Sequence, residues 1–264
     1  MRAASILVLF LAACSSRENI VVGTVYDGPL GEHVLPDVSV TLRDEAGETY
    51  WSGVTDANGS FSGLAPRAQT IFAVIGGEGR VPASFTGVSG LLQLTVPDFL
   101  ERALDDDTTE QVLVNGAPIP SLYGVTTALA DEWRARYAGC PGADAQGGAI
   151  LASVRYFLFD SEATGGDFVP PDVQHPVAEA VSDATGERFS ACYLDADGIA
   201  WDGSAVDAGA AQQFAIFGLP EGRFTLAVRH NITDSVFTDA YFSVYVPLDG
   251  VAARYPLWIE FPLF

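Results

Sequence analysis

The sequence predicts an all-β protein made of two tandem antiparallel β-sandwiches joined by a short helical segment. Three observations predict this fold. Short apolar runs rich in Val, Phe, Tyr and Thr recur along the chain, turn-forming Gly, Asn, Asp and Pro separate them, and one central stretch has helical spacing instead. At 264 residues, 48% of them hydrophobic, the chain is long enough to bury two cores.

The first sandwich is predicted over residues 20–97. Residues 38–42 alternate between apolar and polar side chains, so one face of that strand is expected to be buried. Residues 44–47 and 56–59 are predicted turns, because Asn and Gly tolerate positive φ. The other predicted strands of this unit cover residues 20–25, 48–55, 60–64, 70–74, 80–85 and 91–96.

Residues 98–147 are predicted to form a helical connecting segment. Apolar side chains recur at helical spacing over residues 98–104, and again over 126–137, where Leu129, Trp133 and Tyr137 form an aromatic-rich stripe. Thr126 is the expected N-cap of the second helix and Gly139 its expected stop. The stripe is expected to pack on a sandwich; the alternative is that it lines a ligand groove.

The second sandwich is predicted over residues 148–264, on the basis of a weak internal repeat. Residues 44–48 are similar to residues 183–187, and residues 63–64 and 73–74 are similar to 218–219 and 227–228. This repeat implies that both units share one strand arrangement. The strand-like runs of the second unit cover residues 150–159, 217–228, 241–246 and 255–261.

Four segments of the first unit carry a resemblance to a known family: residues 22–25, 35–42, 55–61 and 63–66. They resemble the carboxypeptidase regulatory-like family, whose transthyretin-like β-sandwich, an Ig-like and carbohydrate-binding-like fold, also occurs in the B-type repeats of bacterial collagen adhesins. The resemblance covers residues 20–97. It implies the fold and an accessory role as a spacer or as a sugar- or protein-contacting module, and it implies no activity.

The N-terminus resembles the signal peptide of a bacterial lipoprotein. Arg2 supplies a positive charge, residues 6–11 are apolar, and Leu11-Ala-Ala-Cys14 is similar to the lipobox, whose cysteine is acylated, with palmitate among its acyl chains. We therefore expect a signal peptide over residues 1–13, lipidation of Cys14, and a tether over residues 14–19. Ser15 favours a lipid anchor in the outer membrane, facing either the periplasm or the cell surface. The alternative is an ordinary cleaved secretory signal.

Two further cysteines, Cys140 and Cys192, are expected to form a disulfide, because an exported chain reaches an oxidising compartment. A pair of free thiols and metal ligation are the alternatives. Metal ligation is disfavoured, because the two cysteines are far apart in sequence and no histidine lies near either of them.

Charge and motif content argue against several function classes. The net charge of −21 repels nucleic acid and anionic lipid headgroups. The three histidines, His33, His175 and His230, stand in no zinc-protease spacing, and no Gly-x-Ser-x-Gly motif is present. The chain has no lysine, which excludes both a phosphate-binding loop and the Lys-based isopeptide bond of adhesin repeats. We expect no catalytic residues and no cofactor; a hydrolase would require a cluster of these histidines with carboxylates.

One acidic and aromatic insertion, residues 193–207, is the candidate ligand site. The residues that could contact a ligand there are Tyr193, Asp195, Asp197, Trp201 and Asp202. Closely spaced carboxylates could bind calcium, although the spacing fails the EF-hand pattern, and the two aromatic rings could stack on a sugar. The alternative is a solvated hairpin. The predicted function is a non-catalytic, membrane-anchored interaction or scaffold module with an envelope protein or glycan as partner, and the second hypothesis is a surface glycan-binding module.

Overall fold

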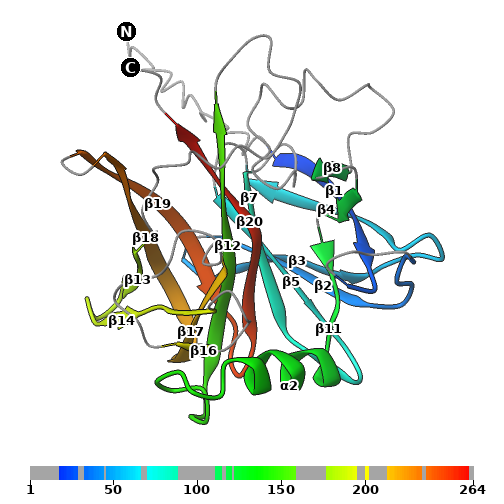
Figure 1. The fold of residues 1–264 in the computed structure, drawn as a ribbon. Helices are drawn as coiled ribbons and strands as arrows, with labels where there is room; N and C mark the ends of the chain where they lie inside the picture. The colour runs from blue at the N-terminus through cyan, green and yellow to red at the C-terminus, as the bar shows by residue number, and fades with distance from the viewer. Residues whose placement is uncertain are drawn as a thin grey trace, which may run out of the picture.

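The computed structural model describes residues 18–28, 33–44, 46–66, 70–88, 111–114, 117–120, 122–158, 177–194, 200–201, 213–233 and 236–261. Nearly all of them lie in strands and tight turns, and a single helix occurs among them (Figure 1). The predicted all-β class is therefore confirmed. In this part of the chain no helix is both long and apolar enough to cross a membrane.

The N-terminal sandwich consists of two facing sheets. One has the order β10-β1-β4, and the other has the order β7-β5-β2-β3. Apolar side chains from both sheets, among them Val25, Leu42, Ile71 and Phe85, form one buried cluster between them. The bounds of the strands are β1 (Glu18–Tyr26), β2 (Ser39–Arg43), β3 (Thr49–Val54), β4 (Ser60–Pro66), β5 (Thr70–Gly76), β7 (Ala83–Val88) and β10 (Leu122–Tyr123).

The C-terminal sandwich has its own core. One sheet has the order β16-β15-β17-β12-β20, and the facing sheet has the order β14-β13-β18-β19. Ile150, Phe214, Phe224 and Val244 are among the side chains buried between the two. The bounds are β12 (Gly148–Leu158), β13 (Val177–Ser182), β14 (Arg188–Ser190), β15 (Cys192–Leu194), β16 (Ala200–Trp201), β17 (Gln213–Leu219), β18 (Gly222–Thr233), β19 (Val236–Val246) and β20 (Val251–Phe261).

The two sandwiches share one set of strand pairings. β1 pairs antiparallel with β4 and parallel with β10, and β12 pairs in the same way with β17 and β20. In the facing sheets, β3-β2-β5-β7 and β14-β13-β18-β19 have the same order, with every pair antiparallel. The weak sequence repeat thus corresponds to a repeated topology.

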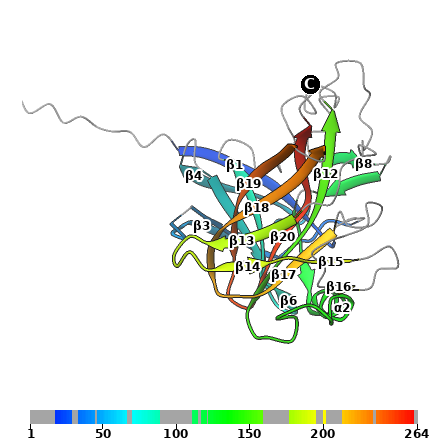
Figure 2. The same ribbon diagram turned by 60° about the vertical axis from the view of Figure 1, so that its left-hand side comes forward.

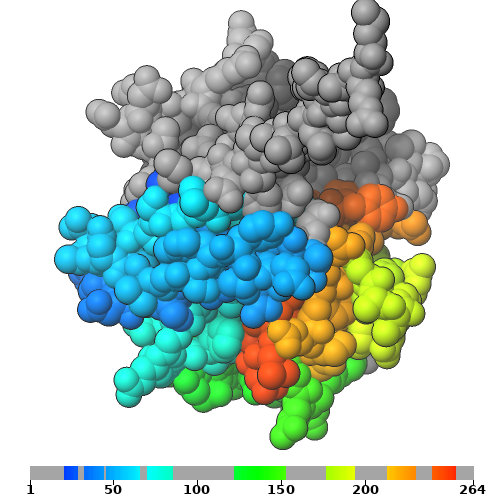
Figure 3. Space-filling view, turned by 180° about the vertical axis from the view of Figure 1, so that it is seen from behind, coloured from blue at the N-terminus to red at the C-terminus, as the bar shows by residue number. Residues whose placement is uncertain are grey.

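The sandwiches are fused side by side through a seam formed by β7 and β20. These strands pair in parallel, with Val251 opposite Ala83 and Ala252 opposite Ser84. The pairing joins one sheet of each sandwich into a continuous nine-stranded sheet. Seen from behind, the blue-to-cyan strands and the orange and yellow-green strands form adjoining halves of one body (Figure 3). β12 and β20 run side by side through the centre (Figures 1 and 2).

The predicted turns are present, and side-chain oxygens stabilise them. Asp56 accepts hydrogen bonds from the backbone N–H groups of Asn58 (2.8 Å) and Ser60 (2.9 Å), which closes the turn between β3 and β4. Asp44 accepts in the same way from the N–H of Glu48 (2.9 Å), between β2 and β3. Each carboxylate therefore supplies an acceptor that the turn backbone lacks.

The connecting segment is only partly helical. Its described helix, α2 (Thr127–Arg136), starts as predicted, because the Thr126 hydroxyl accepts from the N–H of Leu129 (3.1 Å). The helix ends at Arg136, before the expected stop at Gly139. The other described strands of the segment are β8 (Gln111–Val114), β9 (Ala117–Pro120), β10 and β11 (Val125–Thr126). Of these, β11 pairs with β6 (Arg80–Val81). The strand predicted at residues 91–96 and the helix predicted at 98–104 lie outside the described residues.

Candidate functional site

The insertion expected to bind a ligand is described only in part. Tyr193 is 4% exposed, and its hydroxyl accepts a 2.7 Å hydrogen bond from the N–H of Ala178. Burial raises the pKa of this phenol, and the hydrogen bond from Ala178 opposes the shift. A ring packed into the core offers no face on which a sugar could stack, so the surface role expected for Tyr193 is not supported. Its ladder partner is Trp201.

The other predicted site residues mostly lie outside the described part of the chain. This holds for Asp195, Asp197 and Asp202 in the insertion, for His175, and for Cys14 with the whole predicted signal peptide. His33 is described and is exposed. Within the described ranges no group of three or more His, Cys, Asp or Glu side chains could hold a metal ion.

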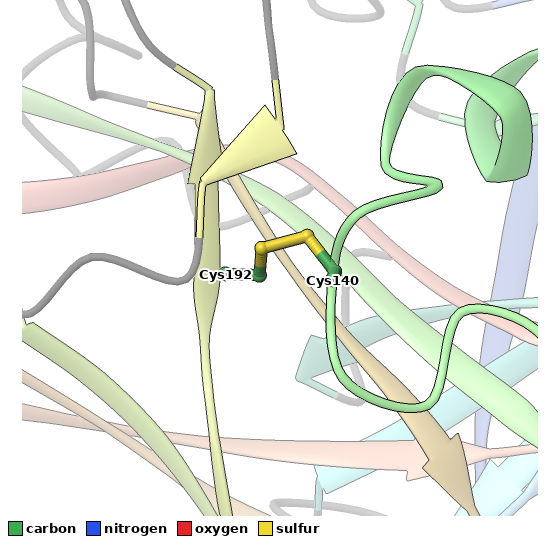
Figure 4. Close-up of a disulfide and its surroundings, with 2 residues drawn as sticks. All are labelled: Cys140 and Cys192. Carbon is green, nitrogen blue, oxygen red and sulfur yellow. A yellow bond between two sulfur atoms is a disulfide. The ribbon is translucent and has the colours of Figure 1, made fainter.

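The expected disulfide between Cys140 and Cys192 is present (Figure 4). It joins the loop that follows α2 to the first residue of β15, with a distance of 5.7 Å between the two Cα atoms. Both cysteines are buried in a small cluster with Tyr137, Ala215 and Phe217. The bond therefore attaches the segment after α2 to the C-terminal sandwich.

The aromatic stripe of α2 packs as expected and also lines a hollow. Tyr137 is buried beside Phe217, with ring centroids 5.8 Å apart, and Trp133 packs half-buried against the N-terminal core. Burial raises the pKa of Tyr137, so its phenol stays neutral. Trp133 also lines a cavity, so packing on the core and lining a hollow do not exclude each other for this stripe.

This seam cavity has a volume of about 330 Å³ and lies where α2, the loop before β12, and β20 meet. Its floor is apolar: Ala149 and Leu151 come from β12, Val251 from β20, and Trp133 and Ala130 from α2. Val81 of β6 also lines the cavity, so the N-terminal unit, the C-terminal sandwich and the connecting segment all contribute to it. In Figures 1 and 2, α2 lies at the end of the molecule where β12 begins.

The rim of the seam cavity is polar and exposed. It includes the carboxylates of Asp131 and Asp249, the guanidinium of Arg134 and the side-chain amide of Gln146. Arg134 reaches the carbonyl oxygen of Gly147 at 3.5 Å. Asp249 occupies the tight turn between β19 and β20 with φ of 48°, a conformation that Asp tolerates better than most residues. Acceptors and donors therefore surround one apolar floor.

This cavity could not have been predicted from sequence patterns. The stripe containing Trp133 was visible, but Gln146 and Asp249 belong to separate turns far apart in the chain. They meet only because β20 runs parallel to β12 and the chain after α2 returns to the sheet. The single clue in the sequence was the stripe of α2, for which lining a groove was the alternative to packing on a sandwich.

A second polar group lies at the seam between the sandwiches. The hydroxyl of Tyr245 accepts from Arg43 (2.7 Å) and donates to Glu221 (2.6 Å), and the Arg43 guanidinium lies 5.3 Å from the Tyr245 ring centroid. Ser84 also donates to the carbonyl oxygen of Tyr245. Burial and the hydrogen bond to Glu221 raise the pKa of Tyr245 to about 12, and Arg43 opposes the shift. This cluster bonds one sandwich to the other.

No protein-family model and no curated protein sequence matches the chain. Among solved structures it is similar to the TIE protein of Bacillus anthracis, with 11% identity and a TM-score of 0.25. The match covers 92% of this chain but only 34% of the TIE protein chain, so this chain spans about a third of that protein's length. It is also similar to the shaft pilin SpaA of Lactobacillus rhamnosus GG (10% identity, TM-score 0.25, 94% of this chain and 99% of that chain). A third similar structure is the minor pilin GBS52 of Streptococcus agalactiae, with 9% identity, a TM-score of 0.23, and coverage of 94% of this chain and 98% of that chain.

These likenesses do not bear on function, because the TM-scores of 0.25 and 0.23 are low. The interpretation below therefore depends on this chain's own residues.

Proposed function

We propose that this protein is a non-catalytic, lipid-anchored module of the bacterial cell envelope that acts as a rigid scaffold or interaction domain. Leu11-Ala-Ala-Cys14 supplies the anchor and Ser15 favours the outer membrane. Because β1 begins at Glu18, only residues 15–17 of the tether expected over residues 14–19 lie between Cys14 and the first strand, and at about 3.4 Å for each extended residue they would hold β1 close to the lipid surface.

The observation that carries this proposal is the disulfide between Cys140 and Cys192. Disulfides persist in oxidising compartments such as the periplasm and the cell surface, and they are rare in the cytosol. The bond supports export independently of the N-terminal pattern, because it depends on different cysteines in a different part of the chain.

The seam supports a scaffold role. Two sandwiches linked by a flexible hinge would sample many relative orientations, whereas the β7–β20 pairing and the Arg43–Tyr245–Glu221 cluster hold these two in one. A fixed orientation presents a partner with a preformed surface, which lowers the entropic cost of binding. The net charge of −21 keeps such a surface soluble and away from nucleic acid.

The anchor is tested by metabolic labelling of the full chain with an alkyne analogue of palmitate in a Gram-negative host, followed by fractionation of the membranes. We expect label and outer-membrane recovery for the natural chain, and loss of both in Cys14→Ser. Ser16→Ala is the matched control, because it changes a neighbouring residue outside the lipobox. A Cys14→Ser chain that stays labelled and membrane-bound contradicts the proposal. So does a natural chain whose Cys140 and Cys192 react with a thiol reagent in intact cells.

A further inference from the structure

We propose that the seam cavity is a binding site for a small, uncharged polyhydroxyl ligand, such as one sugar residue of a glycan. This inference goes beyond the envelope role, and it does not depend on the lipid anchor. The site is distinct from the insertion at residues 193–207, where Tyr193 is buried.

Size and shape limit what can enter. The cavity of about 330 Å³ lies near the lower end of the range of ligand pockets, roughly 300–1,000 Å³. An apolar floor with a few convergent polar groups is the usual composition of a small-molecule site. A single ring fits this space better than a long acyl chain, because the floor is short and polar groups surround it.

The hydrogen-bonding groups of the rim select for hydroxyls. The carboxylates of Asp131 and Asp249 accept hydrogen bonds and the guanidinium of Arg134 donates them. The amide of Gln146 and the hydroxyl of Thr127 do both. An anionic ligand would be repelled by two carboxylates on a protein whose net charge is −21. A cation such as an ammonium group would be attracted by those carboxylates but would offer no acceptor to the guanidinium of Arg134, whereas a hydroxyl supplies one. A hydroxyl group both donates and accepts, so several hydroxyls on one ring can pair with both kinds of group along the rim.

The apolar floor of the cavity fits the apolar face of such a ligand. A sugar ring carries C–H groups on its faces, and these groups pack on apolar and aromatic surfaces. The half-buried ring of Trp133 supplies that surface, and contact with the N-terminal core fixes its position. Gln146 lies in the loop that follows the Cys140–Cys192 bond, so the disulfide helps to preorganise the rim.

The test is saturation-transfer NMR on the full chain in detergent micelles. The probes are the methyl glycosides of glucose, galactose, mannose and N-acetylglucosamine, with choline as the cationic probe and acetate as the anionic probe. We expect transfer to the ring C–H protons of at least one glycoside and none to choline or acetate. Asp131→Asn and Asp249→Asn each replace one acceptor oxygen by a donor, and each should weaken binding about tenfold.

Asp144→Asn is the matched control, because Asp144 is exposed on the same loop as Gln146 but does not line the cavity. Asn tolerates positive φ, so Asp249→Asn keeps the turn. Circular dichroism verifies that each variant is folded. Silence with every glycoside, preferential binding of choline or acetate, or equal binding by all three variants and the natural chain would each overturn the inference. None of these results affects the anchor, which palmitate labelling tests separately.

Discussion

The N-terminal and C-terminal sandwiches have the same strand pairings, but among the described residues the sheet that contains β12 and β17 has two additional strands, and a disulfide attaches it to the connecting segment. β15 and β16 extend its sheet beyond β17, and Cys192 at the start of β15 is bonded to Cys140. In the part of the chain that the structure describes, the equivalent strand of the N-terminal sandwich, β4, is the last strand of its sheet. The shared parts follow from local patterns of alternation and turns, and the differences arise from contacts between distant segments.

The second difference is the position of each sandwich relative to the seam. In the N-terminal sandwich, the sheet that contains β2 and β5 continues through β7 into β20. In the C-terminal sandwich, the corresponding sheet, β14-β13-β18-β19, ends at β19. The facing sheet, which contains β12 and β20, is the one that crosses the seam. The repeat is therefore joined asymmetrically, which places α2 and the seam cavity at one end of the joint.

The largest expected effect comes from removing one buried ring from each core. Phe85 in β7 and Phe224 in β18 are each 1% exposed. Replacement by Ala should cost about 3–5 kcal/mol in either sandwich, because a cavity is left behind. Since the nine-stranded sheet is continuous, we expect both variants to lower the midpoint of one common urea-unfolding transition.

Fluorescence and far-UV circular dichroism provide the two probes for this experiment, and Tyr50→Phe on an exposed side chain is the control. If Phe85→Ala and Phe224→Ala each shifted a different transition, the two sandwiches would be independent units and the seam would not couple them.

The sequence predicts the parts of the fold that depend on neighbours along the chain. Alternation over residues 38–42, the turn at Asp56 and the cap at Thr126 each require only a few adjacent residues, and each prediction is confirmed. The parallel pairing of β20 with both β12 and β7 could not be predicted, because alternation does not specify which strands are neighbours. The disulfide was predictable from the compartment and the even number of remaining cysteines.

The candidate site was harder to predict for the same reason. Tyr193 looked like a surface aromatic among aspartates, but its position in β15 directs the ring into the core. The rim of the seam cavity combines Asp131, Gln146 and Asp249, which share no motif. The parallel pairing of β12 with β20 and the return of the chain after α2 to this sheet bring them together.

A smaller effect is expected from removing the hydroxyl of Tyr245 at the seam. Tyr245→Phe loses the hydrogen bonds to Arg43 and Glu221 but keeps the ring under the guanidinium. Because Arg43 and Glu221 are partly exposed and water can replace the lost bonds, we expect a cost of about 1–2 kcal/mol. The midpoint of urea unfolding at neutral pH measures it.

The pH dependence distinguishes this role from simple packing. The pKa of Tyr245 is about 12 in the folded protein against 10.0 for an ordinary tyrosine, so the fold favours the neutral phenol. Its contribution to the free energy of unfolding is complete below pH 10 and is lost as the pH rises toward 12. Between pH 10 and pH 12, the free energy of unfolding of Tyr245→Phe should therefore decrease less than that of the natural chain. Parallel curves for the two proteins would show that the phenol does not titrate at the seam.

The smallest effect compares the two equivalent turns of the repeat. Gly47, between β2 and β3, has φ of 83°, and Gly186, between β13 and β14, has φ of 72°. A Cβ added at either position would meet no atom within 4 Å, so any cost of Gly→Ala there comes from the backbone conformation alone. Left-handed φ costs a residue with a side chain roughly 1–2 kcal/mol, partly offset by the reduced entropy of the unfolded chain.

We therefore expect Gly47→Ala and Gly186→Ala to destabilise the protein equally, by about 1 kcal/mol each in thermal or urea unfolding. Gly28→Ala is the matched control, since it also has open space around its Cβ but lacks a left-handed φ. That variant should be neutral or slightly stabilising. Equal costs at the two turns would show that the two units share the energetics of this turn as well as their strand order. A cost at one turn only would mean that the two hairpins have diverged in the strain their turns tolerate, although their strand order is the same.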